Sequence, residues 1–314
     1  MLIIDGHTDA ILDVHHGRRD FFERSETGHV DLPRLEEAGV NAVALALFTT
    51  DEYIADAPSH TRALLSTFDR LVMAGRGLIH ARSASDIERS VADGTTAGFV
   101  TIEGGEAIGT SIDTLHEFSD RGVVLMTLTW NRRNSIARGV YGDGDDGLSP
   151  FGREVVREME KIGMIVDVSH LSDRSLADVL AVATKPLVAS HSNARAICNH
   201  PRNLTDDQLR AIADHGGLIG LTFPGVFVDA TPANVTLDRV FDHLSRMIDV
   251  AGIDHIGIGT DFDGFTAPYG LVMSDCAGLP TVAERMATRG YSDDEIDKVM
   301  GRNWLRVIRD VVGE

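Results

Sequence analysis

The chain has 314 residues, of which 43% are apolar and 25% charged, proportions typical of an ordinary globular protein. Its 48 acidic and 29 basic side chains give a net charge of −19, a field that repels nucleic acid and anionic lipid and so excludes both as expected partners. The two cysteines, Cys198 and Cys276, form no C-x-x-C pair, so neither a thiolate zinc site nor a disulfide framework is expected.

Eight short apolar runs, rich in β-branched residues, recur along the chain. Continuous apolar runs of this length, rather than alternating ones, are typical of strands that are covered on both faces. Segments with helical spacing separate most of them, and this alternation predicts parallel strands joined by crossover helices. The predicted strands are residues 2–5, 41–47, 98–103, 123–129, 163–168, 187–190, 217–223 and 255–260.

The predicted helices carry apolar residues three and four positions apart, as an amphipathic helix does. Several begin with a residue that caps a helix well, namely Ser149 before Pro150, Ser172 and Thr205. The last helix begins with Ser292, which starts an S-x-x-E capping box. The predicted helices are residues 59–74, 150–162, 172–183, 205–215, 237–251 and a C-terminal helix at 292–311.

Two architectures fit this pattern, a closed barrel and an open doubly wound sheet. Eight strand–helix units in roughly 260 residues favour the barrel, and no G-x-G-x-x-G follows the first strand, which weakens the dinucleotide-binding alternative. Neither a Pro/Gly/Ser-rich linker nor a block of like charge divides the chain. We therefore predict one domain, residues 1–314, folded as a (β/α)8 TIM-type barrel, with the polar segment 130–147 as a candidate lid over its mouth.

Possible metal ligands and carboxylates follow five of the eight predicted strands. Barrel active sites gather at the carboxyl ends of the strands, so these residues should meet. A lone histidine in such a place is more often a hydrogen-bonded structural residue, but this ordered set is much harder to obtain by chance. The residues are His7 and Asp9 after the first strand, then Glu103, His170, His191 and Asp261.

Their chemistry fits a two-metal hydrolase. Imidazole and carboxylate together suit Zn2+ with an open position for water. His7 and Asp9, two residues apart, point to the same side of an extended chain and can bind one ion. His170 and His191 follow adjacent strands and can bind a second ion, and Glu103 between the pairs can bridge both.

Asp261 supplies the remaining element of this mechanism. Two ions ~3.5–4 Å apart can hold a bridging hydroxide and lower its pKa toward neutrality. On the opposite side, Asp261 would take the proton and pass it to the leaving amine.

At this point the sequence resembles the membrane dipeptidase (renal dipeptidase) family, nearly from end to end. The resemblance implies a binuclear zinc dipeptidase on a (β/α)8 barrel. The matching motifs are Asp5-Gly6-His7-Thr8-Asp9, Ile102-Glu103-Gly104-Gly105, Gly147-Leu148-Ser149-Pro150-Phe151-Gly152, Asp167-Val168-Ser169-His170, Ser190-His191-Ser192, Arg202-Asn203 and Gly259-Thr260-Asp261-Phe262-Asp263-Gly264.

The resemblance also implies a role for each site residue. Arg202 would pair with the C-terminal carboxylate of the substrate, because a guanidinium binds a carboxylate bidentately, and this would restrict the enzyme to dipeptides. Without the resemblance, Arg202 would be read as a surface-loop arginine. The other implied roles are one zinc held by His7, Asp9 and Glu103, a second held by Glu103, His170 and His191, and proton transfer by Asp261.

The sequence departs from the family at one position. Many members carry a histidine in a T-L-T-H stretch, where it stabilises the oxyanion of the tetrahedral intermediate. Here the stretch ends in Trp130 and Asn131, as in bacterial relatives with T-W-N. An indole N–H can donate but cannot become cationic. We expect Trp130 to form a wall of the pocket that helps select the substrate, and Asn131 or another donor to replace the histidine.

Three functions remain open at this point. The first is hydrolysis of dipeptides, including those with a D-residue at the C-terminal position. The second is a related amidohydrolase acting on an N-acyl amino acid or a cyclic amide, because a fold does not fix a substrate. The third is a catalytically weak metal-binding scaffold in a biosynthetic pathway, which the replacement at Trp130 favours and the intact ligand set opposes.

Location and assembly are expectations of the same kind. The chain begins without a basic or apolar leader, and no apolar run reaches the ~20 residues that span a bilayer. We therefore expect a cytoplasmic protein without a membrane partner. Family members often form dimers, so a homodimer is the assembly that the resemblance suggests, although no interface patch can be read from the sequence.

Overall fold

The computed structural model describes residues 1–265 and 272–314, and within them eight parallel strands close into a ring. Each strand pairs with the next around the ring, and pairing of β2 with β4 closes it. The predicted (β/α)8 barrel is therefore confirmed. The ring strands are β1 (Ile4–Thr8), β2 (Ala42–Phe48), β4 (Thr96–Glu103), β5 (Val123–Thr127), β6 (Ile165–Asp167), β7 (Val188–Ala189), β8 (Leu218–Leu221) and β9 (Ile256–Ile258).

One further strand was not predicted. β3 (Leu78–His80) pairs only with the first residues of β4, where Leu78 lies opposite Thr96. Only two apolar residues, Leu78 and Ile79, stand between Gly77 and His80, so no apolar run distinguishes this strand from a loop.

The first predicted strand was placed too early. It was expected to end at Asp5, but β1 continues to Thr8, so His7 lies within the strand rather than after it. The apolar run ends at Ile4, because the strand continues through the buried polar residues Asp5, His7 and Thr8.

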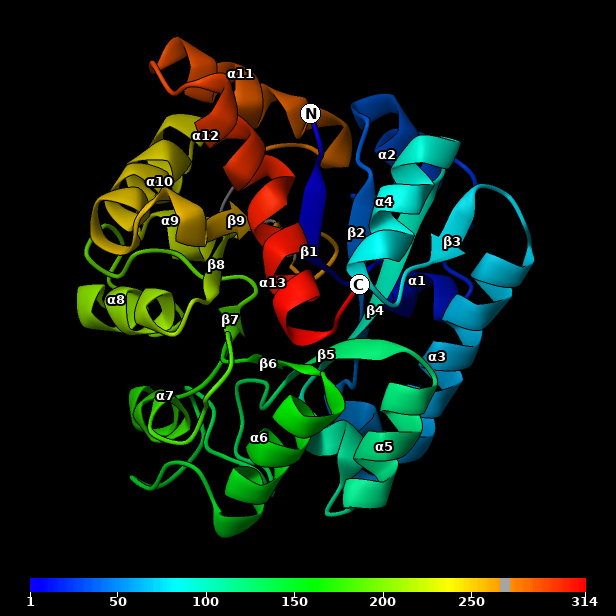
Figure 1. The fold of residues 1–314 in the computed structure, drawn as a ribbon, viewed down its shortest axis with the longest axis vertical. Coiled ribbons are helices and arrows are strands. Elements are labelled where there is room, and N and C mark those ends of the chain that lie inside the picture. Colours follow the sequence, from blue (N-terminus) through cyan, green and yellow to red (C-terminus); the bar gives the residue numbers. More distant parts are fainter. Residues whose placement is uncertain (266–271) are drawn as a thin grey trace.

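Helices surround the ring of strands (Figure 1). Those predicted from apolar spacing are present, and the side chains of Ser149, Ser172 and Thr205 accept the expected capping hydrogen bonds. The helices are α1 (Ala10–His15), α2 (Leu32–Ala38), α3 (Ala57–Met73), α4 (Ala84–Asp93), α5 (Ile112–Asp120), α6 (Pro150–Ile162), α7 (Asp173–Leu180), α8 (Asp206–Asp214), α9 (Gly225–Val228), α10 (Leu237–Ala251), α11 (Pro280–Thr288), α12 (Asp293–Asp297) and α13 (Asn303–Val311).

The C-terminal helix has an internal irregularity. The capping box of Ser292 with Glu295 is present, but a π-helical turn, Lys298–Arg302, separates α12 from α13. A side chain at Gly301 would meet the backbone oxygen of Leu2 at 2.5 Å, so the turn brings the helix against the start of the first strand. After its cap at Ser292, the predicted segment is thus helical to Val311, with one π-helical turn between two α-helical parts.

α13 closes the amino end of the barrel. It lies across the middle of the ring of strands in Figure 1, and the fully buried Trp304 projects from it. The Trp304 indole donates a 2.7 Å hydrogen bond to the Ile258 carbonyl oxygen. A Cβ atom at Gly6 would overlap the indole, which explains why glycine stands there. An apolar cluster joins this helix to inward-facing strand residues such as Phe99 and Leu218.

The segment 130–147, predicted as a lid, contains no helix and only isolated β-bridges. It is anchored through Ile136, which is fully buried, and through pairing of Gly139 with Leu171.

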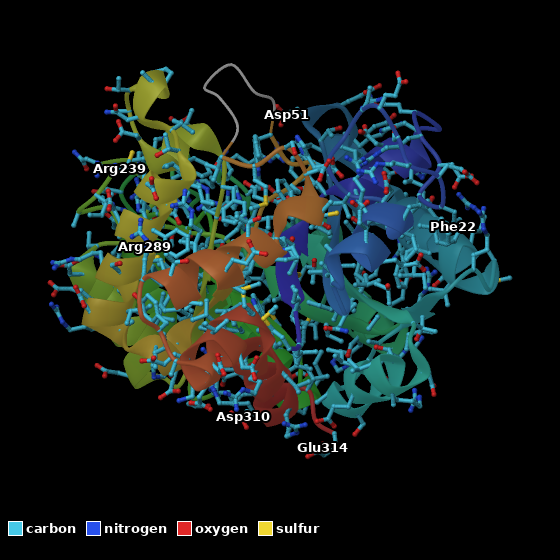
Figure 2. The ribbon with its side chains drawn as sticks, turned by 90° about the horizontal axis from the view of Figure 1, so that it is seen from above. Phe22, Asp51, Arg239, Arg289, Asp310 and Glu314 are labelled. Atoms are coloured by element: carbon cyan, nitrogen blue, oxygen red, sulfur yellow. The ribbon has the colours of Figure 1, made fainter. Side chains whose placement is uncertain are left out.

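In Figure 2, Asp51, which follows β2, lies near one end of the molecule, and Asp310 and Glu314 lie at the other. Among the described residues, no helix combines the length and the apolar character that a membrane span requires.

Candidate metal centre

The predicted site residues lie together at the carboxyl end of the barrel. Parallel strands all end on this side, so residues that are far apart in the sequence become neighbours. None is more than 8% exposed. They are His7 within β1, Asp9 directly after it, Glu103 at the end of β4, and His170, His191 and Asp261 in the turns after β6, β7 and β9.

Two groups of possible ligands overlap in Glu103. His7, Asp9 and Glu103 form one group, and Glu103, His170 and His191 form the other, with the ligand atoms of each group within 4.8 Å of one another. The Oε1 atom of Glu103 lies 3.0 Å from His170 Nε2, whereas its Oε2 atom lies 3.7 Å from His7 Nε2. One carboxylate therefore faces both groups, one oxygen to each.

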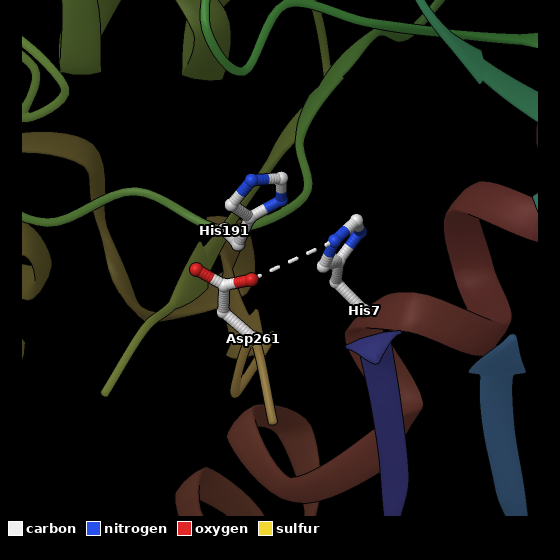
Figure 3. A group of neighbouring side chains, drawn as sticks. All are labelled: His7, His191 and Asp261. Atoms are coloured by element: carbon white, nitrogen blue, oxygen red, sulfur yellow. Dashed lines mark ion pairs between the residues drawn. The ribbon is translucent and has the colours of Figure 1, made fainter. Parts of the chain in front are cut away.

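Asp261 lies beside one histidine from each group, His7 and His191. Its Oδ1 atom lies 3.8 Å from His7 Nε2, the ion pair drawn as a dashed line in Figure 3. Figure 3 also shows His191 beside this pair, and the three residues can form a third group of ligand atoms. Burial, and to a lesser degree the charge of Glu103, raise the pKa of the Asp261 carboxyl to about 7.

Unpaired polar atoms indicate that the groups fit cations. Both ring nitrogens of His7 and the Oδ1 atom of Asp9 are buried without a hydrogen-bond partner. Buried polar atoms normally find a partner, so these atoms call for a ligand. Burial and the charge of Glu103 hold the pKa of Asp9 well above its usual value, because buried carboxylates crowd together without enough positive charge.

His170 and His191, the histidines of the second group, direct unprotonated Nε2 atoms toward each other. Asn131 Oδ1 can only accept, so the Nδ1–H of His170 donates to it over 2.8 Å and leaves His170 Nε2 free. Nε2 of His191 lies 2.8 Å from that atom. Burial lowers the pKa of His170 to about 4 and that of His191 well below its usual value, so both rings are neutral. Neutral imidazoles are the form that binds zinc.

Backbone strain is concentrated at the same place. In the described part of the chain, the non-glycine residues with positive φ are His170, Asp261 and Asp263, at 68°, 63° and 68°. This region is unfavourable for side chains with a Cβ, and such strain clusters at functional sites. Asp263 is held by an ion pair with Arg19 and by the His29 backbone N–H, which fixes the turn that carries Asp261.

Trp130 and Asn131 line a cavity of about 200 Å3 whose lining also includes the candidate ligands Asp9, Glu103 and His170. The Trp130 ring lies between Phe48, 5.3 Å away between centroids, and the Arg132 guanidinium, 4.9 Å from its centroid. Asn131 also lines the cavity while its side-chain oxygen holds His170. The apolar part of the lining includes Phe227 and Phe265.

Arg202 stands behind this cavity rather than on its lining. It is 3% exposed, and its Nη2 donates a 3.3 Å hydrogen bond to the backbone oxygen of His191. Its Nε atom is buried without a partner. The guanidinium therefore lies beside the candidate metal centre with donor capacity to spare, and it is not the exposed surface arginine that its loop position would suggest.

Sequence reasoning overlooked two buried carboxylates, Asp5 and Asp167. Asp5 accepts hydrogen bonds from the Thr260 backbone N–H and hydroxyl, at 2.9 and 2.6 Å. Asp167 accepts the same two bonds from Ser190, at 2.9 and 2.6 Å. Asp5 and Asp167 each begin one of the matching motifs, but neither was predicted to be a site residue. Their signal was an acidic residue inside an otherwise apolar strand, where a charge must be paired.

Together the barrel and this buried cluster of imidazoles and carboxylates define a class of protein, the metal-dependent hydrolases built on a (β/α)8 barrel. Comparison with known proteins narrows the class. The model of the membrane dipeptidase family, peptidase family M19, matches residues 1–313. The chain therefore belongs to the membrane dipeptidase family, and the predicted enzyme class, a metal-dependent dipeptidase, is confirmed.

Individual relatives agree with this assignment. Dipeptidase tcpJ of Claviceps purpurea is 32% identical over 98% of this chain and 76% of its own length. The solved structure of dipeptidase AC, an M19 metallopeptidase, covers 100% of this chain and 99% of its own, with 30% identity and a TM-score of 0.92. A metallopeptidase from Rhodobacter sphaeroides, bound to a phosphinate mimic of the dipeptide L-Ala-D-Ala, covers 99% of both chains, with 30% identity and a TM-score of 0.90.

Proposed function

We propose that this protein is a binuclear zinc dipeptidase whose two metal positions share Glu103. The observation that carries the proposal is the division of the Glu103 oxygens between two buried groups of ligands, Oε1 toward His170 and Oε2 toward His7. His7 and Asp9 would complete one position, and His170 and His191 the other. A bridging carboxylate of this kind suits a pair of ions ~3.5–4 Å apart.

When bound, two zinc ions would lower the pKa of a water molecule and polarise the scissile carbonyl group. The protein contributes the remaining steps. Asp261, buried beside His7 and His191, would accept the proton of the attacking water and deliver it to the leaving amine. The raised pKa of Asp261 supports this role, because a group that both accepts and donates works best near the operating pH.

Arg202 would bind the C-terminal carboxylate of the substrate. Its unpaired Nε and its burial support this role, since a buried guanidinium gains most from a bidentate anion. A longer peptide has no carboxylate at that position, so the site would select dipeptides. The R. sphaeroides metallopeptidase binds a mimic of L-Ala-D-Ala, and we propose that this chain also accepts a D-residue at the C-terminal position.

Trp130 would act as a rigid wall that helps select the substrate. Contacts with the tilted Phe48 ring and the Arg132 guanidinium restrict the Trp130 ring, whose centroid lies 6.1 Å from that of the His170 ring. Trp130→His should change the order in which the enzyme prefers its substrates. If order and rate both stay the same, Trp130 only packs against its neighbours.

The test is kcat/KM of the zinc-loaded protein on L-Ala-L-Ala, L-Ala-D-Ala and N-acetyl-D-alanine. We expect turnover of at least one dipeptide, and we expect it to disappear on chelation and return with zinc. Turnover of only the acetylated compound would reassign the protein to amidohydrolases that need no free amine. No turnover of any compound by a protein with two bound zinc ions would contradict the proposal.

A further inference from the structure

Resting on the binuclear zinc site proposed above, we infer that Asp167 and Ser190 form a relay that sets the proton of His191 and so keeps its Nε2 available for zinc. The relay is a chain of hydrogen bonds. Ser190 Oγ lies 2.6 Å from Asp167 Oδ2 and 2.8 Å from His191 Nδ1. All three residues are buried. Asp167 and Ser190 are positioning residues, because they act on the metal site only through His191.

The direction of the hydrogen bonds follows from the proton count. A serine hydroxyl has one proton, and a carboxylate can only accept. The Ser190 proton is therefore directed to Asp167, and Ser190 Oγ accepts from the Nδ1–H of His191. The other hydroxyl nearby, Ser169 Oγ, is farther away at 3.3 Å and can itself donate to Ser190. The result is an imidazole with its proton on Nδ1 and a lone pair on Nε2.

A second carboxylate in the barrel repeats the arrangement and supports this direction. Asp5 accepts the Thr260 hydroxyl at 2.6 Å, and Thr260 Oγ1 in turn accepts the Phe262 backbone N–H at 3.1 Å. A backbone N–H can only donate, so the direction is unambiguous here. The same order of groups occurs twice, but only in the Asp167 copy does the final donor belong to a candidate ligand.

Asp167→Asn should reverse the relay. An amide NH2 in place of Oδ2 would donate to Ser190, so the serine proton would turn toward His191 Nδ1 and force the ring proton onto Nε2. The opposite orientation of the introduced amide group is also unfavourable, because it would place two sets of donors against each other. Its NH2 would then face the backbone N–H groups of Ser169 and Ser190, which Asp167 Oδ1 accepts at 3.0 and 2.9 Å. Ser190→Ala removes the relay without reversing it.

Thr127→Val is the matched control. The Thr127 hydroxyl donates to the same Asp167 Oδ2 atom at 2.6 Å, so its loss removes an equally buried hydrogen bond but leaves the direction of the relay unchanged. His191→Gln is the second control, because it removes the proposed ligand itself. The measurement is zinc stoichiometry and affinity of each full-length variant by competition with a chromogenic chelator, with no substrate present.

We expect wild type to bind two zinc ions and His191→Gln to lose tight binding of one. Asp167→Asn should weaken one of the two sites by about 10–100-fold, Ser190→Ala by about tenfold, and Thr127→Val by less than about threefold. If His191→Gln matches wild type, the proposed metal site fails. If His191→Gln loses an ion but Asp167→Asn and Ser190→Ala both match Thr127→Val, the relay alone is wrong. If Asp167→Asn does not fold, the zinc affinities of Ser190→Ala and Thr127→Val are compared instead, and equal affinities would contradict the relay.

Discussion

The two ends of the barrel differ in almost every physical respect. The amino end is closed by apolar packing around Trp304, and its polar groups are paired: the Asn303 side-chain amide donates to two backbone oxygens, at 2.8 and 2.7 Å. The carboxyl end buries carboxylates and imidazoles, leaves the nitrogens of His7 unpaired, and holds His170 and Asp261 at positive φ.

This difference separates stability from function. Apolar burial and satisfied hydrogen bonds at the amino end stabilise the fold, which lets the carboxyl end keep unpaired and strained groups that only a ligand relieves. Substitutions at the two ends should therefore have opposite signatures. Those at the carboxyl end should change metal binding and turnover, and those at the amino end should change the free energy of unfolding.

The largest effect should come from Asp261→Asn. Loss of the carboxylate that we propose as the proton acceptor should lower kcat by about 10²–10⁴-fold. The metal-free variant should unfold at a temperature no lower than wild type, because it removes a buried carboxylate that faces Glu103. Steady-state kinetics and calorimetry check both points. A variant that keeps wild-type kcat would remove Asp261 from the mechanism.

Trp304→Ala should have the largest effect on folding. It empties a fully buried indole site and leaves the Ile258 carbonyl without its donor, so we expect a loss of about 3–5 kcal/mol in the free energy of unfolding. Urea denaturation measures it. Met73→Ala, at a position that is 82% exposed, is the control and should change stability by less than about 0.5 kcal/mol. Equal effects at the two positions would refute the role of the amino end.

His243→Gln should give a smaller effect that depends on pH. His243 accepts the Ala194 N–H at Nδ1 and donates from Nε2 to the Val228 oxygen, which requires a neutral ring. Burial lowers its pKa to about 4, a hydrogen bond to Val228 opposes the shift, and Arg239, Asp242 and Asp229 are the charged groups that face it.

The unfolded chain takes up this proton near pH 6.5, but the folded chain does so only near pH 4. The contribution of neutral His243 to stability is therefore complete above pH 6.5 and falls as the pH drops toward 4, by about 2 kcal/mol at pH 5. In His243→Gln that part of the loss between pH 7.5 and pH 5 should be absent, as measured by urea denaturation at each pH. His16→Gln, at an exposed position, should keep the wild-type slope. An unchanged slope in His243→Gln would assign the acid sensitivity to other groups.

The sequence predicted the barrel because each ring strand lies in a continuous apolar run of the chain, even where the strand itself is only two or three residues long, as in β6, β7 and β9. It missed β3, whose apolar run is only Leu78-Ile79, and the short helices α1, α2, α9 and α11. It also missed α4 and α5, although Leu115 and Phe118 of α5 lie three residues apart on its buried face. The capping residues Ser83 and Ser111 were the available signal for these two helices.

The site was accessible to sequence reasoning for a geometric reason. Parallel strands bring their carboxyl ends together, so a list of strand-end residues is already a list of neighbours. What the residues contact could not be read in this way. The hydrogen bond between His170 and Asn131 depends on a turn that holds His170 at positive φ. The hydrogen bonds from His191 through Ser190 to Asp167 depend on side-chain directions that an apolar pattern does not give.

The most direct test of the account is anomalous diffraction at the zinc absorption edge from crystals of the zinc-loaded protein. The account predicts two peaks at the carboxyl end, about 3.5–4 Å apart, one beside His7 and Asp9, the other beside His170 and His191, with Glu103 between them. A single peak, or two peaks that do not share Glu103, would contradict the central claim that one carboxylate joins two metal positions.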